Sequence, residues 1–399
     1  MNIFHKVYCR GFQGVMKIVL PMMPYREPQI LESVTDIAQV LIESEITKVM
    51  VVTDSGIRGL GLEKGLLRSL RDNKIKYEIF DEVVPNPTVE VVEKAVEIYN
   101  STSCMAIIAL GGGSVIDCAK GLGARIANPK KSLNKMKGLL KVKGPIPKFF
   151  AIPTTAGTGS ETTVSAVITD EKTHHKYVIN DFDLIPNYAV LDADLTVGLP
   201  VGLTATTGMD ALTHAIEAYI GGATTVETRK HALESARLIF ENLPKVCEDG
   251  KNIRARSQML KASYLAGLSF TRSYVGYVHA VAHTLGGKYG VAHGLANAVI
   301  LPYVLAEYGS AIYKKLKVMA VYCNLARPYD NEQIATSKLL NRIREMNEKF
   351  GIPKTFDCIV EQDIPDLAAL ASKEANPLYP VPKLMNAKEL TKIYYRIKA

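Results

Sequence analysis

The feature that most constrains the fold is a regular alternation of two patterns over the first two hundred residues. Short apolar runs lie at 48–54, 76–83, 104–110, 148–155 and 187–195. Stretches with helical periodicity separate the first of them, at 61–73, 89–100 and 117–128. Strands that alternate with helices of this length predict a parallel sheet with right-handed crossovers, the doubly wound α/β class. Thr88, in a PNPT turn, is expected to cap the helix that follows it.

The pattern changes at the segment 198–205, GLPVGLTA. From about Thr204 onward the apolar periodicity is helical, with few β-branched clusters, as in 234–246, 256–270 and 335–350. A chain of 399 residues is also long for a single core. We therefore predict two domains, an α/β domain over residues 1–200 and an all-helical domain over residues 201–399.

Composition excludes several classes of protein. With 47% hydrophobic and 22% charged residues the chain has the composition of a globular protein. Lys and Arg are scattered apart from a segment at 130–148, which we expect to be a solvated loop, so we expect no nucleic-acid partner. The six cysteines form no CxxC pair, and we find no signal peptide and no apolar run of 18 residues. The sequence predicts a cytoplasmic protein that does not bind membranes.

A glycine-rich turn follows the third apolar run, with the sequence GGGS at 111–114. Gly112 and Gly113 would let the backbone approach a ligand closely, and a helix that opens at Ser114 would offer N–H groups to a phosphate. Ser114 and Asp117 also have the spacing of a capping box. On its own this motif is as compatible with a tight turn that binds nothing.

Two other strand ends carry side chains that suit a nucleotide. Asp54 ends the first run, where a carboxylate can accept hydrogen bonds from a ribose, although Asp is also common in turns. Thr154, Thr155 and Thr158, in IPTTAGTGSE at 152–161, could donate to a pyrophosphate or a carboxamide, or could serve the loop itself. Open α/β sheets bind ligands at the carboxyl ends of their strands, so the three loops together predict a dinucleotide site.

The second half contains the spacing of a metal site. Asp210 and His214 lie four residues apart in a predicted helix, so they share a helix face. His279, His283 and His293 fall within fifteen residues of a chain that has only eight histidines. One carboxylate with two or three imidazoles suits Fe²⁺ or Zn²⁺. Spacing alone allows both His279 and His283 to reach the metal.

Five segments, taken together, resemble the iron-containing (group III) alcohol dehydrogenase family. They are VVPNPT (83–88), GGGSVIDCAK (111–120), IPTTAGTGSE (152–161), GMDALTHAIEAY (208–219) and GYVHAVAHTLGGKYGVAHG (276–294). Their order and character are most similar to the lactaldehyde/propanediol oxidoreductases and the butanol dehydrogenases. The resemblance implies an N-terminal dinucleotide domain and a helical metal domain, the dehydroquinate synthase-like plan.

The resemblance also implies roles for individual residues. It makes Asp210, His214, His279 and His293 the ligands of Fe²⁺, with Zn²⁺ as the other possible metal, and it places His283 beside the substrate. The implied nicotinamide-cofactor residues include Asn86, Ser165 and Lys176 in addition to Asp54, Gly112, Gly113, Ser114, Thr154, Thr155 and Thr158. The charge of Asp54 favours NAD over NADP, because it would repel a 2′-phosphate.

The implied activity is hydride transfer between the nicotinamide cofactor and a small primary alcohol, diol or aldehyde, in a homo-oligomer built from dimers. Two alternatives stay open: a zinc-type polyol dehydrogenase or the related dehydroquinate synthases, and a silent regulator that binds metal and nucleotide. The sequence departs from the family pattern at Val115 and Ala292, where Pro is usual. It also departs in FTRSYVGY (270–277), where we expect Arg272 and Tyr274 to affect the substrate entrance. The segment 1–30 is longer than in typical members.

Overall fold

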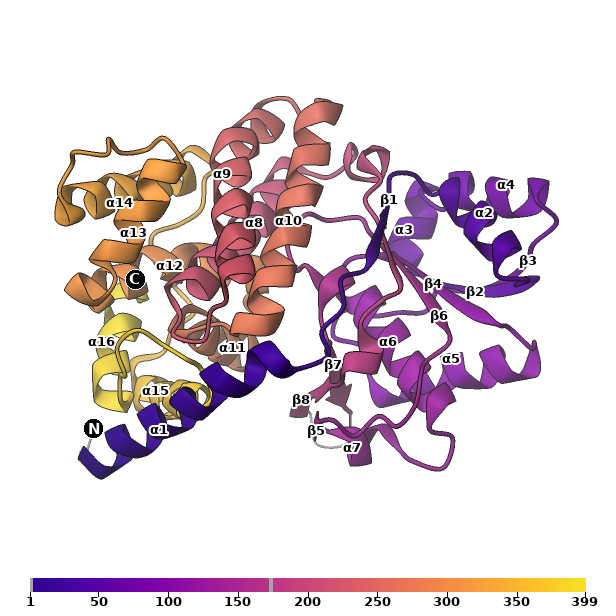
Figure 1. Ribbon diagram of the computed structural model, residues 1–399, viewed down its shortest axis with the longest axis horizontal. Helices are drawn as coiled ribbons and strands as arrows, with labels where there is room; N and C mark the ends of the chain where they lie inside the picture. The colour runs from indigo at the N-terminus through magenta and orange to yellow at the C-terminus, as the bar shows by residue number, and fades with distance from the viewer. Residues whose placement is uncertain (1–2, 172–174) are drawn as a thin grey trace. The chain divides into compact units, whose positions relative to one another are not determined.

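A computed structural model describes residues 3–171 and 175–399 of the chain. Its contacts divide the chain into two compact units, which are described separately (Figure 1). The α/β unit comprises residues 24–197, and the helical unit comprises residues 198–399 together with the described residues up to 23. This division differs at the N-terminus from the assignment of residues 1–200 to one domain, because the first helix packs with the helical unit.

The α/β unit is built on a six-stranded sheet with the order β1-β9-β6-β4-β2-β3, in which every pair is parallel. Its strands are β1 (Gln29–Leu31), β2 (Lys48–Val52), β3 (Lys76–Phe80), β4 (Ala106–Gly111), β6 (Lys148–Pro153) and β9 (Tyr188–Val190). The five apolar runs are confirmed as strands. The sixth strand, β1, has only three residues, which is too short for a periodicity to reveal.

Helices cover both faces of this sheet, which confirms the doubly wound class. Met50 and Val52 of β2 face a core shared with α5 (Val89–Ser101) and α6 (Gly113–Ala127), whereas the alternate residues Val49 and Val51 face a core shared with other helices. These other helices are α2 (Asp36–Glu43), α3 (Ser55–Leu60) and α4 (Lys64–Asp72). Thr88 caps α5 as predicted, accepting a hydrogen bond from the Val91 N–H at 3.2 Å.

A smaller three-stranded sheet has the order β5-β8-β7, formed by β5 (Gly138–Leu139), β8 (His175–Asn180) and β7 (Ser165–Asp170). The expectation of a solvated loop at 130–148 is wrong in part. That segment contains α7 (Leu133–Met136) and β5, and it buries Leu133, Met136 and Val142 in the α/β core. The many lysines of the segment hid these three apolar anchors.

The helical unit is all α, as the sequence predicted. Its helices are α1 (Ile3–Val19), α8 (Val201–Ile220), α9 (Val226–Glu248), α10 (Ile253–Ser273), α11 (Tyr277–Tyr289), α12 (His293–Tyr308), α13 (Tyr313–Tyr322), α14 (Glu332–Lys349), α15 (Ile364–Ala375) and α16 (Ala387–Ile397). Helix α8 packs against α9, α10 and α12 and is buried on all sides from Gly208 to Ile220. A polar side chain on this part of α8 is therefore isolated from water.

No single helix of the described residues is long and apolar enough to cross a membrane. One bent pair, His293–Ala311 with Tyr313–Tyr322, meets the criterion only when the two helices are taken together.

Candidate functional site

Four of the predicted metal ligands converge inside the helical unit. Asp210 and His214 come from the buried helix α8, His279 from the first turn of α11, and His293 from the first residue of α12. One donor atom from each of the four lies within 4.8 Å of the others. One carboxylate oxygen and three imidazole nitrogens at this spacing fit a divalent transition metal, so the residues present suit the cation that the sequence predicts.

Glu217 is a member of this cluster that the sequence analysis missed. Its Oε2 lies 2.6 Å from Nδ1 of His279, and its two oxygens also accept hydrogen bonds from the N–H groups of Gly276 and Val278, each at 2.8 Å. The side chain is fully buried, and this burial raises the pKa of the Glu217 carboxyl to about 7 against the opposing effect of the backbone hydrogen bonds. Glu217 therefore orients the His279 ring and fixes the start of α11.

Asn297, one turn into α12, is the second member that was missed. Its Nδ2 donates to Oδ1 of Asp210 at 2.6 Å and lies 3.2 Å and 3.1 Å from Nε2 of His279 and of His293. The residue is completely buried. Its amide nitrogen thus lies beside the ligand atoms of three of the four residues, and it can donate to two of them at a time.

His283 does not join the four converging donors. It lies one turn beyond His279 on α11, with its ring stacked on that of His293 at a centroid distance of 5.3 Å. Its Nδ1 forms a hydrogen bond of 2.7 Å with Oε1 of Glu374, which also accepts one from the Tyr379 hydroxyl at 2.8 Å. Burial alone would lower the pKa of His283, but the charge of Glu374 and its hydrogen bond outweigh it and raise that pKa.

A sequence signal existed for two of the missed residues. Glu217 lies at i+7 from Asp210 and at i+3 from His214, and Asn297 lies at i+4 from His293, so each shares a helix face with a predicted ligand. No such signal existed for Glu374. It is 91 residues from His283 and comes from a different helix, α15.

The predicted nucleotide loops lie at the carboxyl ends of neighbouring strands of the α/β sheet. Strands β2, β4 and β6 are neighbours, and each is parallel to the next. Their carboxyl ends lead to Asp54, to Gly112 and to Thr154, respectively. Asp54 is the N-cap of α3 and accepts a hydrogen bond from the Ile57 N–H at 2.9 Å. The turn role and a ligand role are compatible, because the cap occupies only one carboxylate oxygen.

Three more predicted cofactor residues are joined by hydrogen bonds. The Asn86 N–H donates to the hydroxyl of Ser114 at 3.3 Å, and Lys176 donates to the Asn86 side-chain oxygen at 2.8 Å. The prediction that Ser114 and Asp117 form a capping box is therefore wrong. Gly112 is the N-cap of α6, and the Asp117 carboxylate accepts from the Val167 N–H instead.

The remaining predicted residues line the loops after β4 and β6. A Cβ on Gly113 would come within 3.0 Å of the Thr158 methyl, and one on Gly112 would lie 3.8 Å from the Thr155 hydroxyl, so the two loops are in contact. Thr154 is buried, and its N–H donates to the carbonyl of Gly111.

Ser165 opens β7, beside the smaller sheet. Its hydroxyl donates to the Asn180 side-chain oxygen, and its carbonyl accepts from the buried Lys120 ammonium at 2.9 Å. Lys120 also binds the carbonyl and hydroxyl oxygens of Thr163. Lys120, which the sequence analysis did not select, therefore holds the segment 163–165 in place through three hydrogen bonds.

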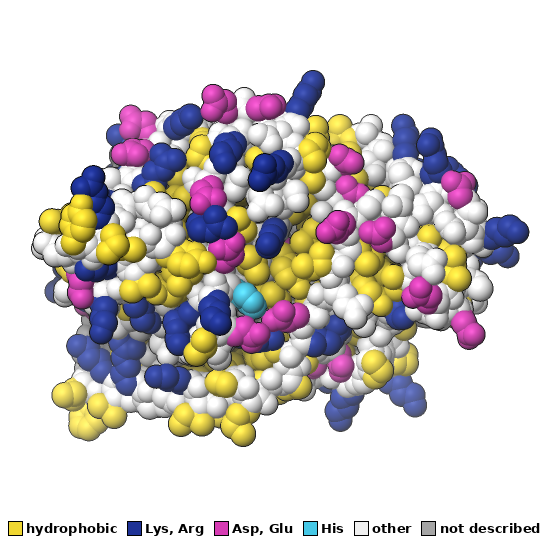
Figure 2. Space-filling view, turned by 45° about the horizontal axis from the view of Figure 1, so that its top comes forward, with side chains coloured by type: hydrophobic (Ala, Val, Ile, Leu, Met, Phe, Trp, Pro, Cys, Tyr) yellow, Lys and Arg dark blue, Asp and Glu magenta, His cyan; other side chains and the backbone are white. Residues whose placement is uncertain are grey.

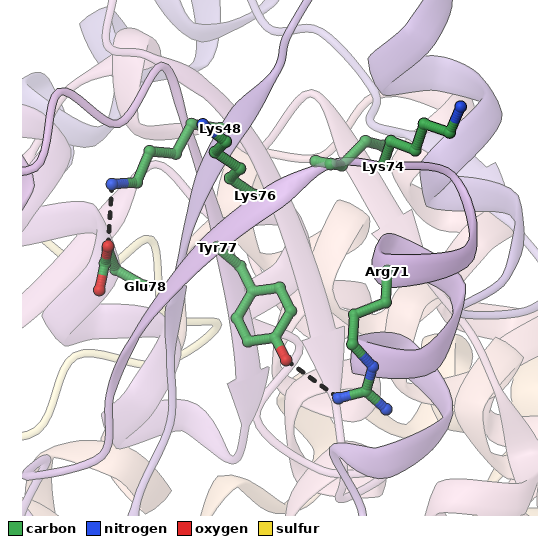
Figure 3. A pocket seen from close by; sticks show the side chains of 7 residues that line it. Lys48, Arg71, Lys74, Lys76, Tyr77 and Glu78 are labelled. Atoms are coloured by element: carbon green, nitrogen blue, oxygen red, sulfur yellow. Dashed lines mark hydrogen bonds and ion pairs between the residues drawn. The ribbon is translucent and has the colours of Figure 1, made fainter.

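A basic hollow of about 430 Å³ lies elsewhere on the same unit (Figure 3). Lys48 and Lys76, which line it, are the first residues of β2 and β3, so the hollow is at the amino ends of the strands. Two of its cationic groups are already paired: Lys48 with Glu78 at 2.8 Å, and Arg71 with the Tyr77 hydroxyl at 3.0 Å. The hollow is therefore not part of the predicted nucleotide site, whose loops follow the carboxyl ends of the strands.

The chain thus joins a doubly wound unit to a helical unit with a cluster of one carboxylate and three imidazoles that could hold a metal ion. Comparison with known families identifies the class of protein. The model of the iron-containing alcohol dehydrogenases matches residues 29–193, and that of the C-terminal part of the same family matches residues 204–397. The chain belongs to the iron-containing alcohol dehydrogenase family.

Individual relatives support this assignment. The chain is 35% identical over 329 residues to the NAD-dependent methanol dehydrogenase of Bacillus methanolicus, covering 82% of this chain and 86% of the relative. It is 37% identical over 333 residues to the NADPH-dependent butanol dehydrogenase of Clostridium saccharobutylicum, covering 82% and 85%. The crystal structure of a 1,3-propanediol oxidoreductase superposes with a TM-score of 0.90 at 34% identity, covering 94% of this chain and 99% of that one.

These findings confirm the resemblance, the fold class and the kind of enzyme. The chain is an oxidoreductase that acts on CH–OH groups and on the corresponding aldehydes. Among the interpretations considered above, they support an alcohol dehydrogenase of the iron-containing family.

Proposed function

We propose that this enzyme transfers a hydride between NAD(H) and a small primary alcohol, diol or aldehyde, with Fe²⁺ held by Asp210, His214, His279 and His293. The observation that carries the proposal is the convergence of these four ligand groups within 4.8 Å in the helical unit, with three of the four residues buried and His293 partly exposed. When bound there, the cation would supply a Lewis acid for the substrate oxygen. Iron rather than zinc follows from the family alone, since imidazole and carboxylate accept either ion.

His283 is proposed to exchange a proton with the substrate oxygen. Its Nδ1 is engaged by Glu374, which leaves Nε2 as the nitrogen that can hold or release that proton. The ring stacks on that of His293, so it stands beside the donor cluster without belonging to it. Glu374 and Tyr379 keep the ring in one orientation and one tautomer.

The loops of the α/β unit are proposed to bind the cofactor, whose nicotinamide accepts or gives the hydride. The N–H groups at the start of α6 after Gly112 and Gly113 would bind the pyrophosphate. Asn86, Ser114 and Lys176 form one polar group beside them, completed by Thr154, Thr155, Thr158 and Ser165. Asp54 would bind the ribose hydroxyls. Since relatives of similar identity are named for NAD and for NADPH, the charge of Asp54 is the feature that favours NAD here.

The substrate is proposed to be small and uncharged, like the methanol, butanol and 1,3-propanediol for which the relatives are named. Arg272, which we expected near the substrate entrance, forms an ion pair with Glu227 at 2.7 Å, so part of its charge is neutralised. We further propose that the enzyme is cytoplasmic, because the six cysteines are free thiols, as in a reducing compartment. That it is a homo-oligomer follows from the family resemblance alone.

The test is a metal analysis paired with turnover. Protein purified anaerobically, stripped with a chelator and reloaded with Fe²⁺ or with Zn²⁺ should reduce NAD⁺ with 1-propanol, 1-butanol and 1,3-propanediol, and should be fastest with iron. Full activity with zinc and none with iron would refute the choice of metal. A fully loaded protein that turns over none of these alcohols, nor their aldehydes with NADH, would refute the choice of substrate.

A further inference from the structure

Helix α1 is an addition to an otherwise complete family fold. The family match begins at residue 29, after α1 (Ile3–Val19) has ended. The 1,3-propanediol oxidoreductase structure is covered to 99% by this chain, whereas only 94% of this chain is covered in return. The helix therefore lies outside the residues that the family models match.

One face of α1 is fixed to the helical unit. The Arg10 guanidinium donates to the carbonyls of Val381 and Pro382 at 2.7 Å and 2.9 Å. The Gln13 amide donates to the carbonyl of Tyr379 at 2.6 Å, and Cys9 between them is completely buried. The helix thus lies along the edge of this unit in a defined orientation, as the indigo ribbon in Figure 1 shows.

The opposite face of α1 carries an apolar stripe. Its large side chains are between 58% and 81% exposed, and with the following residue Met22 they comprise Ile3, Phe4, Val7, Tyr8, Val15, Ile18 and Met22. The helical periodicity places the six side chains that belong to α1 on one side of the helix, and Met22 lies in the 3-10 turn Leu20–Met22 that follows it. Hydrophobic side chains crowd the lower left edge in Figure 2 accordingly. The basic residues Lys6, Arg10 and Lys17 lie along one margin of the stripe, not within it.

Two glycines occupy the centre of this stripe. Gly11 and Gly14 lie three residues apart, and a Cβ built on either would meet nothing within 4 Å. Exposed glycine weakens a helix, so its presence twice at the centre of an apolar face needs a reason. Small residues on a helix surface let the backbone of a second helix approach closely, as they do between membrane helices.

The size of the stripe also fits a helix partner. Seven side chains exposed to this extent present apolar surface on the order of 900 Å², comparable with the ~800 Å² that each partner contributes to a stable interface. Monomeric proteins rarely leave so large an apolar patch in water. A second copy of the chain carries an identical stripe with an identical glycine notch, so a two-fold axis would satisfy both at once.

We propose that α1 is a self-association helix, whose apolar stripe packs against the same stripe of a second chain with the two helices crossing at Gly11 and Gly14. The other possible occupant is an anionic membrane surface. It is less favoured because basic residues lie along only one margin of the stripe, and because glycines would add nothing to insertion into lipid.

The proposal is tested by the mass of the full-length protein in sedimentation velocity. Val7→Glu with Val15→Glu places two charges on the stripe and leaves Arg10, Gln13 and Cys9 unchanged. The matched control, Val226→Glu with Val318→Glu, changes two exposed valines of the same unit. We expect the stripe variant to have half the mass of the wild type over the micromolar range, and the control to match the wild type. Equal masses for wild type and stripe variant would overturn the proposal.

Gly11→Leu distinguishes close helix packing from general hydrophobic adhesion. The substitution fits the single chain, favours the helix and adds apolar surface, yet it would fill the notch where the helices cross. We expect association to weaken at least 10-fold. Association that is unchanged or stronger would refute the crossing. Wild-type protein that stays at the mass of the stripe variant, but co-sediments with phosphatidylglycerol vesicles, would assign the stripe to a membrane instead. If the charged variant fails to fold, as judged by its circular dichroism, Gly11→Leu carries the test alone.

Discussion

The carboxylate of Glu217 lies 2.6 Å from Nδ1 of His279, and the two residues come from different helices, α8 and α11. Because Nδ1 is engaged by the carboxylate, Nε2 is the ring nitrogen directed at the donor cluster, where it lies 3.2 Å from the Asn297 amide. A carboxylate behind a ligating histidine fixes the tautomer of the ring and makes it a stronger ligand. The function of Glu217 is thus exerted through His279.

We predict that Glu217→Gln lowers the affinity for the metal by about 10- to 100-fold, since the amide cannot replace the charge behind the imidazole. Affinity is measured by competition with a chelator. Glu345→Gln is a suitable control because the Glu345 side chain is 66% exposed. The thermal midpoint of the metal-free proteins separates this effect from a loss of stability, because Glu217 also holds the start of α11. Unchanged metal affinity in the variant would show that Glu217 serves only the helix.

The second prediction concerns the division of roles among the three clustered histidines. His279→Ala and His293→Ala should each abolish retention of the metal, because each removes one of four donors. His283→Ala should keep the metal and lower kcat by roughly 10- to 1000-fold, as expected for the loss of a proton-transfer group. Metal content and turnover of the three variants are measured side by side. A His283 variant without metal, next to a His293 variant that keeps it, would reverse the assignment.

The sequence predicts the doubly wound fold because buried parallel strands consist of continuous runs of apolar residues, and such runs can be recognised in a short stretch of sequence. It does not predict β1, which has three residues, nor the attachment of α1 to the helical unit. That attachment depends on Arg10 and Gln13 reaching carbonyls more than 360 residues away. Partners at that separation leave no trace in a local pattern.

The same distinction applies to the site. The i, i+4 spacing of Asp210 and His214 is local, and it identified two of the four converging donors without any structure. The partner of His283 is not local, because Glu374 belongs to α15. The capping box of Ser114 and Asp117 failed for a related reason: both side chains have the right spacing, but each has its hydrogen-bond partner in another segment. Spacing predicts which residues can meet, while the tertiary fold decides which do.

A third prediction tests the preference for NAD over NADP. Asp54→Gly should raise the ratio of kcat/KM for NADPH to that for NADH by roughly 10-fold or more, since the charge that repels a 2′-phosphate is lost. Asp54→Asn is the matched variant, because its side-chain oxygen can still accept from the Ile57 N–H and cap α3. It should show a similar change with less loss of stability. A wild-type enzyme that uses NADPH as well as NADH would contradict the role of Asp54.

The fourth prediction follows from a buried carboxyl in the α/β unit. Glu161 is 1% exposed, and neither of its oxygens has a hydrogen-bond partner among the described residues. Burial raises the pKa of this carboxyl to about 7, although the charge of the buried Lys120 opposes the shift. The folded protein therefore prefers the neutral acid. The stability that this preference contributes is fully present below the unfolded pKa, near 4.5, and is lost as the pH rises through about 7.

Glu161→Gln keeps the shape of the side chain and removes its ionisation. From pH 5 to pH 8 the stability of the variant should therefore rise relative to that of the wild type, by on the order of 1–3 kcal/mol. Each kcal/mol corresponds to roughly 2–4 °C in the thermal midpoint of a unit of this size, which calorimetry at the two pH values resolves. The exposed substitution Glu345→Gln should leave the difference between the two pH values unchanged. A Glu161→Gln advantage that stays constant or shrinks toward pH 8 would mean that the wild-type carboxyl is already ionised at pH 5, held in that form by Lys120.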